Sequence, residues 1–317
     1  MTSDNAVRPR ISAVIPTLNR REDLLEFAAT LVKQTVPCDE LLIVDAGDVP
    51  DMEEALATAL AGTGCELVYR RSPAGTSLQR NVALDLLTGD FVFLFDDDVL
   101  LEPDYIERTL EAFSHPADPP VGCVLGTFLS EPRPQGLRQR WFRAFGMTHA
   151  VAGEPGISTS GGVRWPIEPD GVVEIPVASG GRTAYRREAI GAERFDEFLP
   201  GYTMSEDVEF SFRIGQAWTI VQSPHARLFH KRAPTSRVDY GDRVSRLIYS
   251  RFYFFKKHLP KDPRTLAAFA WTNLGITVFY TGVGLLRAPA GDKAGVFRGV
   301  ARGYRRCAAD LLGREVR

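Results

Sequence analysis

Short apolar runs alternate with helix-like repeats over the N-terminal third of the chain. Apolar runs closed by polar or turn residues are typical of buried strands, and they occur at residues 11–15, 41–44, 67–69 and 91–95. Apolar residues at three- and four-residue spacing, as on one face of a helix, occur at residues 24–32, 52–61, 78–87 and 105–113. Strands that alternate with helices predict an α/β fold, with a mainly parallel central sheet flanked by helices.

The pattern changes between residues 130 and 176. This stretch is rich in proline and glycine and also contains Trp141, Phe142, Phe145 and Trp165. We expect a long excursion with some local helix rather than a separate domain. Regular structure is expected to resume near Val177.

Charged residues are distributed unevenly along the chain, although the overall composition is ordinary. The balance of 44% hydrophobic and 25% charged residues excludes a disordered chain, a collagen and a multi-span membrane protein. The formal net charge is −2, but residues 243–317 hold 15 basic and 4 acidic residues. We therefore expect an α/β domain at 1–242 and a basic helical extension at 243–317. A basic tail indicates an anionic partner, such as a lipid surface or nucleic acid, or else a solvated helical face. The net charge of −2 argues against a globally basic nucleic-acid binder, and we expect no nucleic-acid partner.

The segment 266–286 has 21 residues without a charge, enough for a helix to cross about 30 Å of hydrocarbon. Threonines, Asn273 and three glycines dilute it, and basic residues flank both ends, whereas a span leaves fewer positive charges on one side. A helix lying on an anionic leaflet is favoured. A true span and a soluble, packed or dimerising helix pair are the alternatives.

Cysteines and the N-terminus bear on location. Four scattered cysteines fit a reducing compartment, and the polar residues 1–10 do not resemble a cleaved signal peptide. We expect a cytoplasmic protein, peripheral at the inner face of the membrane.

Acidic residues follow two of the predicted strands. Asp96, Asp97 and Asp98 come directly after residues 91–95, and Asp45 ends the second strand. In an extended segment alternate side chains share a face, so Asp96 and Asp98 can converge on a divalent cation. An acidic loop at the sheet edge and a turn aspartate are the plain alternatives.

Other polar groups add candidate chemistry. The first turn, Pro16-Thr-Leu-Asn19, lacks the glycine patterns of dinucleotide-binding folds and P-loops. Arg80, at the start of a helix, can serve a diphosphate or lie in solvent. Glu206 and Asp207 open an apparent helix, where acids cap the backbone or remove a hydroxyl proton. His230, near a strand end, can be structural or a metal ligand.

Taken together and in this order, the motifs from residue 11 to 230 resemble family 2 glycosyltransferases with the GT-A fold. The resemblance implies an inverting enzyme that moves a sugar from a nucleotide-diphosphate donor to an acceptor hydroxyl. It implies a site for Mg²⁺ or Mn²⁺ on Asp96, Asp98 and His230, and Asp207 as the catalytic base. It implies donor contacts by Pro16, Thr17, Asn19, Asp45, Arg80, Asp97, Gly181 and Glu206.

The acceptor expected from this resemblance is a glycan or a lipid-linked glycan, in cell-surface polysaccharide or glycolipid synthesis. The chain departs from the family at Ala46-Gly47, where a serine is usual, and at Arg182-Thr183, where many members have asparagine. A degenerate nucleotide- or glycan-binding module is the alternative. A nucleotidyltransferase is a weaker alternative, since it would need a basic glycine-rich loop near the N-terminus.

Overall fold

A computed structural model describes residues 8–129, 136–151, 154–166, 169–197, 205–231, 239–287 and 293–314. Most of the polar N-terminus considered above, residues 1–7, lies outside this set. The chain forms two compact units, and neither is one continuous segment. The first draws its residues from 1–131, 169–202 and 206–233, and the second from 132–168, 203–205 and 234–317.

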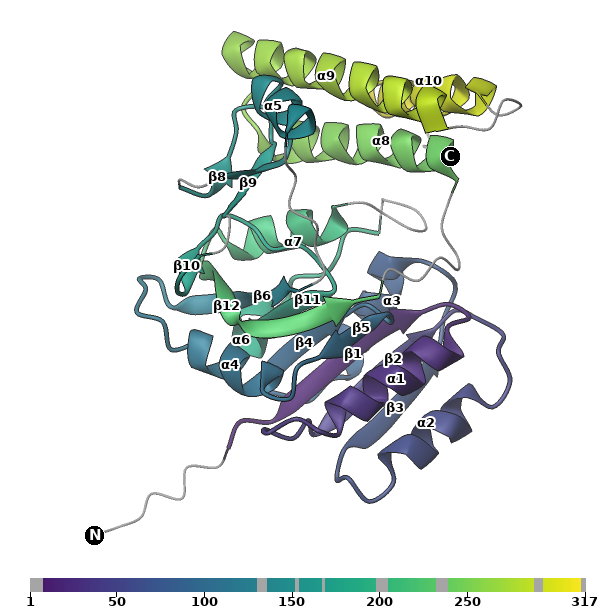
Figure 1. Cartoon of the computed structure of the whole chain (residues 1–317), viewed down its shortest axis with the longest axis vertical. Coiled ribbons are helices and arrows are strands. Elements are labelled where there is room, and N and C mark those ends of the chain that lie inside the picture. The colour runs from purple at the N-terminus through teal and green to yellow at the C-terminus, as the bar shows by residue number, and fades with distance from the viewer. Residues whose placement is uncertain are drawn as a thin grey trace. The chain divides into compact units, whose positions relative to one another are not determined.

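The first unit is built on a nine-stranded sheet (Figure 1). Its strands lie in the order β10 (Val173–Glu174), β12 (Thr219–His230), β6 (Val121–Phe128), β11 (Arg182–Arg186), β4 (Phe91–Phe95), β1 (Ile11–Thr17), β2 (Glu40–Asp45) and β3 (Glu66–Arg71), and β5 (Val99–Leu101) pairs with β12. β1, β2, β3, β4, β6 and β12 run in the same direction. The predicted α/β fold with a mainly parallel sheet is confirmed.

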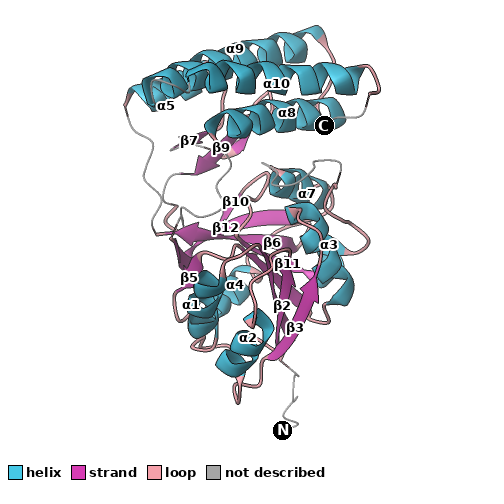
Figure 2. Cartoon of the chain, turned by 90° about the vertical axis from the view of Figure 1, so that its right-hand side faces the viewer, coloured by secondary structure: helices cyan, strands magenta, loops and turns pink. Residues whose placement is uncertain are grey.

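Helices cover both faces of this sheet (Figure 2). On one face, α1 (Arg21–Leu31), α2 (Met52–Leu60) and α4 (Tyr105–Ala112) bury apolar side chains, among them Phe27 and Leu56. On the other lies α3 (Thr76–Leu86); the unit also holds α6 (Arg187–Ile190) and α7 (Glu206–Ile214). Strands covered on both faces need apolar side chains in both directions, which is why β1, β2 and β4 are almost wholly buried.

The second unit is mainly helical. It contains α5 (Leu137–Ala144), α8 (Tyr240–His258), α9 (Pro263–Arg287) and α10 (Lys293–Leu311). It also contains a small sheet of β7 (His149–Val151), β9 (Val163–Pro166) and β8 (Gly156–Ile157). Helices α8 and α10 approach closely because Gly241 and Gly299 face each other: a Cβ on Gly299 would lie 2.3 Å from the Gly241 carbonyl oxygen.

The excursion expected at 130–176 is divided between the units. Residues 136–151 and 154–166 belong with the C-terminal helices, and residues 169–176 belong to the sheet of the first unit. This differs from the boundary expected at residue 242. The local helix expected there is α5, but the three strands were not expected. They are two to four residues long, too short for an alternating pattern to stand out in the sequence.

Candidate functional site

The acidic loop lies between β4 and β5, at the carboxyl end of β4. β5 pairs antiparallel with β12, and this register sets His230 opposite Val99. The Nε2 atom of His230 thereby comes 3.1 Å from the Oδ1 atom of Asp98. One ligand atom each from Asp96, Asp98 and His230 fall within 4.8 Å of one another. Two carboxylates and an imidazole at this spacing fit a divalent cation such as Mg²⁺ or Mn²⁺.

The turn after β1 holds the middle of the acidic loop. Thr17 donates its hydroxyl to the Oδ2 atom of Asp97 at 2.9 Å. The Arg20 guanidinium lies 3.5 Å from Asp97 and 3.4 Å from Asp98. Burial raises the pKa of Asp97 to about 7, against the lowering effect of Arg20 and Thr17. We therefore read Thr17 and Arg20 as the groups that orient the loop.

Arg20 was not among the site residues expected from the sequence, although it directly follows the first turn, Pro16-Thr-Leu-Asn19. The signal available in the sequence was its position. A cation that directly follows the turn after β1 lies at the same carboxyl end of the sheet as the acidic cluster. A second missed cation is Arg182, whose guanidinium lies 4.4 Å from the centre of the Phe128 ring. The His230 ring also packs on Phe128, at 4.9 Å between ring centroids. Arg182 is therefore part of the wall beside the candidate metal ligands.

Arg80 is enclosed rather than open to solvent. It projects from α3 and is 2% exposed. Its guanidinium lies 2.9 Å from Glu206 and 3.5 Å from Asp96. Burial disfavours its charged form, but the carboxylates of Glu206, Asp96 and Asp207 outweigh this and raise the pKa of Arg80. The structure thus places Arg80 among carboxylates of the site, and contact with a donor diphosphate stays a prediction.

Asp207 lies in the first turn of α7, directly after Glu206. The backbone N–H groups of Gly180 and Val208 donate hydrogen bonds to its carboxylate, the latter at 2.8 Å. These bonds set the orientation of Asp207, while the neighbouring Glu206 points to Arg80. The adjacent carboxylates therefore have different surroundings.

Two glycines bring the candidate base and the candidate metal ligands together. A Cβ on Gly180 would lie 3.0 Å from the Asp207 carboxylate, and one on Gly181 would lie 2.3 Å from the Asp96 carboxylate. Gly181 also has φ +77°, a backbone conformation that favours glycine. Gly181 was predicted as a donor-binding residue. Its place in the structure is a close backbone approach to Asp96.

Asp45 and Asn19 link the first two turns at the sheet edge. The Asp45 carboxylate is fully buried and accepts hydrogen bonds from the Gly47 N–H at 2.6 Å and from the Tyr69 hydroxyl. Burial, together with this bond, raises the pKa of Tyr69 to about 12. The Asn19 side chain accepts from the Asp48 N–H at 2.9 Å. The expected contact of Asp45 with a nucleotide base stays a prediction, since its carboxylate already has these partners.

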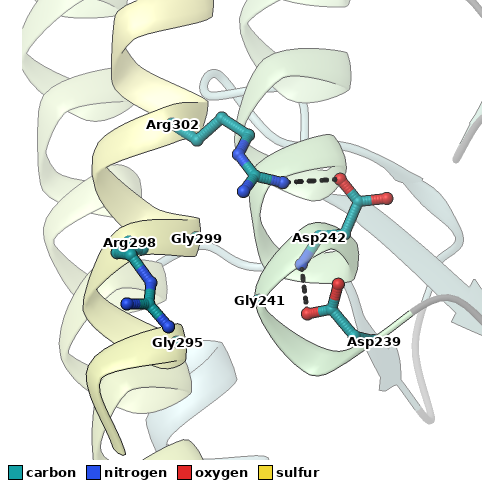
Figure 3. A pocket seen from close by; sticks show the side chains of 7 residues that line it. All are labelled: Asp239, Gly241, Asp242, Gly295, Arg298, Gly299 and Arg302. Carbon is teal, nitrogen blue, oxygen red and sulfur yellow. Dashed lines mark hydrogen bonds and ion pairs between the residues drawn. The ribbon is translucent and has the colours of Figure 1, made fainter. Parts of the chain in front are cut away.

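Pro16, Thr17 and Asn19 lie in or just after the end of β1, and Pro16 pairs with Val44 of β2. All the predicted site residues thus belong to the first unit. One pocket of about 230 Å³ lies in the second unit and holds none of them (Figure 3). It is lined by Asp239, Gly241, Asp242, Gly295, Arg298, Gly299 and Arg302.

Comparison with known proteins agrees with this fold. Residues 12–168 match the family described as glycosyl transferase family 2. Among curated proteins, the chain is 24% identical over 98 residues to glycosyltransferase GlyG of Streptococcus pneumoniae serotype 4, which covers 31% of this chain and 33% of the relative. The chain thus matches about a third of that relative's length.

Two solved structures are similar across almost the whole chain. The mannosyltransferase PcManGT of Pyrobaculum calidifontis, in complex with GDP-Man and Mn²⁺, has a TM-score of 0.57 at 17% identity, over 98% of this chain and 85% of that one. TarS 1–349 of S. aureus, in complex with UDP, has a TM-score of 0.57 at 15% identity, over 96% and 82%. These likenesses concern the fold. Residues 12–168 thus resemble a domain of glycosyl transferase family 2, and the chain has the GT-A fold of these glycosyltransferases.

Proposed function

We propose that this protein is an inverting, metal-dependent glycosyltransferase that moves one sugar from a nucleotide-diphosphate donor to an acceptor hydroxyl. One observation carries the proposal. The Gly180-Gly181 turn lies against Asp207 on one side and against Asp96 on the other, so the candidate base and the candidate metal ligands share one site. A transferase of this kind needs both, because charge develops on the leaving group while the acceptor loses a proton.

Asp96, Asp98 and His230 would hold Mg²⁺ or Mn²⁺, which would offset negative charge on the leaving diphosphate. Their spacing and their oxygen and nitrogen donors support this assignment. The PcManGT structure, which is a complex with GDP-Man and Mn²⁺, supports it by analogy. Thr17 and Arg20 keep the loop that carries Asp98 in position.

Asp207 would accept the proton of the acceptor hydroxyl as that oxygen attacks the anomeric carbon. Attack from the face opposite the leaving diphosphate inverts the anomeric configuration. The Gly180 N–H donates to Oδ2 of this carboxylate and the Val208 N–H donates to Oδ1, which fixes the orientation of the group. Glu206, which pairs with Arg80, positions Arg80 near Asp96 and is a positioning residue in this scheme.

The donor would lie along the sheet edge formed by Pro16, Thr17, Asn19 and Asp45. Arg80, Asp97 and Gly181 complete the edge toward the diphosphate. The acceptor would be a glycan or a lipid-linked glycan, in cell-surface polysaccharide or glycolipid synthesis at the cytoplasmic face of the membrane. The basic C-terminal region supports this location.

A donor screen with a base variant tests the proposal. Thermal stability and release of nucleoside diphosphate are measured with UDP-, GDP- and dTDP-sugars, with and without Mn²⁺. Asp207→Asn should lower turnover about 10²- to 10⁴-fold and leave donor binding nearly unchanged. Asp85→Asn, which alters an exposed aspartate paired with Arg194, is the matched control. Near-normal turnover in Asp207→Asn would refute its assignment as base.

The Asp98→Ala variant tests metal binding separately from base catalysis. We expect this variant to lose the part of donor affinity that depends on Mn²⁺, because one of the candidate ligands is removed. Donor affinity that stays the same in the presence of metal would count against Asp98 as a ligand. A folded wild-type chain that binds a donor but never turns it over would instead support a degenerate binding module.

A further inference from the structure

The outward face of α9 is apolar and exposed. Leu266, Trp271, Leu274 and Val278 each expose about half of their surface, with values of 48%, 51%, 50% and 49%. No charged residue occurs between Arg264 and Arg287. A surface helix of a soluble protein normally turns a polar face to water, and a helix that is apolar all round is normally buried. α9 fits neither description.

The remaining sides of α9 are packed within the second unit. Phe269 stacks on Phe255 of α8 with ring centroids 4.0 Å apart. Thr277 shares a hydrogen bond of 2.7 Å with the Tyr304 hydroxyl of α10. Thr272 donates its hydroxyl to the carbonyl oxygen of Phe145, just after α5, at 2.6 Å. Contacts on three sides leave one continuous stripe of the helix exposed.

This packing favours a helix that lies on a membrane over one that crosses it. By length and composition, Pro263–Leu286 could span a bilayer, and 22% of its apolar window is buried inside the protein. Its polar Thr272 is buried and hydrogen-bonded to Phe145 and Ser160. A lone spanning helix would need apolar side chains around its whole circumference.

α10 widens the apolar stripe. Phe297, Tyr304 and Leu311 are seven residues apart and are 54%, 39% and 67% exposed, so they share one face of the helix. Because Tyr304 contacts Thr277, this face borders α9. We name the exposed apolar residues of both helices the apolar face: Leu266, Trp271, Leu274, Val278, Phe297, Tyr304 and Leu311.

Arginines stand beside the apolar face on both sides. On α10, Arg298, Arg302 and Arg305 are exposed. Arg298 and Arg302 reach the rim of the pocket between α8 and α10, where Arg302 lies 3.4 Å from Asp242 (Figure 3). On the other side, α5 exposes Arg138, Arg140 and Arg143.

Negative charge is scarce in the same three helices. α5 and α9 contain no acidic residue, and the one acid of α10, Asp310, is buried and pairs with Lys256 at 2.7 Å. An apolar surface edged by arginines, on helices α5, α9 and α10 that expose no carboxylate among their described residues, is complementary to an anionic lipid surface. A second protein copy would bring the same arginines against each other at these edges.

We infer that the second unit docks on an anionic membrane, with the apolar face in the boundary between headgroups and acyl chains. The arginines of α5 and α10 would lie at the level of the lipid phosphates. This deepens the location given under the proposed function by assigning the surface and its lipid partner. It requires neither donor binding nor turnover, so a failure here and a failure of the transferase assignment give different results.

Vesicle binding by the full-length chain tests the inference. The chain is sedimented with vesicles of phosphatidylcholine alone or of phosphatidylcholine mixed with phosphatidylglycerol. We expect binding to the anionic vesicles, weakened by salt. The double variant Leu274→Asp, Val278→Asp should reduce it at least about tenfold, because two half-exposed apolar side chains would become charged. Val32→Asp, at a residue 38% exposed in the first unit, is the matched control.

Two further variants separate charge from apolar contact and from folding. The double variant Arg298→Gln, Arg305→Gln should weaken binding to anionic vesicles and should not change binding to phosphatidylcholine vesicles. Trp271 should report insertion directly, as a blue shift of emission on anionic vesicles that Trp271→Phe reduces while binding is retained. Unchanged binding by the Leu274→Asp, Val278→Asp variant would overturn the inference. So would a wild-type chain that ignores both vesicles and forms a dimer that this variant dissociates.

Discussion

Two arginines hold together carboxylates that would otherwise repel one another. Arg20 lies between Asp97 and Asp98, and Arg80 lies between Asp96 and Glu206. Close carboxylates disfavour each other's ionised form, and a nearby positive charge offsets this repulsion. These two side chains therefore make the acidic loop compatible with folding, whether or not a cation is bound.

Arg80→Met tests this at one residue. Removing the guanidinium breaks the ion pair between Arg80 and Glu206, which are 2% and 7% exposed, and breaking a buried ion pair costs about 3–5 kcal/mol. We expect a large fall in the free energy of unfolding, measured by denaturant titration. Arg108→Met is the control, since Arg108 also pairs with two carboxylates, Asp104 and Glu111, but is solvent-exposed. Equal effects of the two changes would contradict the argument.

Glu40 gives a pH-dependent prediction. Burial alone would raise its pKa, but hydrogen bonds from Ser12, Thr88 and Gly89 outweigh this and lower the pKa of Glu40 in the folded protein. A lowered pKa stabilises the folded state above the unfolded value, about 4.3, and this gain is lost as the pH falls through the folded pKa.

The free energy of unfolding of the wild type and of Glu40→Gln should therefore differ most near neutral pH. The difference should shrink below about pH 4, because a protonated glutamate resembles glutamine. Urea titrations at a series of pH values measure it. A difference that stays constant, or grows in acid, would mean that the hydrogen bonds to Glu40 do not set its titration.

At the level of elements, glycines decide how closely helices pack in the second unit. A Cβ on Gly299 would lie 2.3 Å from the Gly241 carbonyl oxygen, whereas a Cβ on Gly282 of α9 would meet nothing within 4 Å. Both residues lie inside helices, where alanine is favoured over glycine by about 1 kcal/mol. The same substitution should thus have opposite effects at the two positions.

Gly299→Ala should destabilise the protein because α8 and α10 must move apart. Gly282→Ala should stabilise it by up to about 1 kcal/mol through helix propensity alone. Thermal unfolding followed by helical circular dichroism compares them. Stabilisation by both substitutions would show that the contact between α8 and α10 yields at little cost.

At the scale of the whole molecule, the two units should respond to different ligands. Hydrogen exchange measured along the chain should show that a donor with Mn²⁺ protects amides of the first unit, above all near 95–98 and 206–207. Anionic vesicles should protect α9 and α10 in the second unit. Ligands that bind only the native state raise its stability by about 2.7 kcal/mol at a hundredfold excess over Kd. Donor protection confined to the second unit would contradict the assignment of donor binding to the first unit.

Local patterning predicted the first half of the sheet well. The expected ranges match β1, β2, β4, α1 and α2 closely. The spacing of apolar residues that indicates a strand or a helix repeats within a few neighbouring residues. The acidic loop was predictable for a related reason: parallel strands end at one edge, so polar residues after them meet there. Short strands such as β7 and β8 gave only weak signals in the sequence.

The order of motifs along the chain was enough to define the fold class, the candidate base and the candidate metal ligands, because each is a short segment with its own chemistry. Only the tertiary structure decided which groups meet. His230 reaches Asp98 through the register of β5 with β12, and Arg80 of α3 pairs with Glu206 of α7, 126 positions further along the chain. The apolar face exists because three sides of α9 are covered and one is not. Such pairings join distant segments, and no local period encodes them.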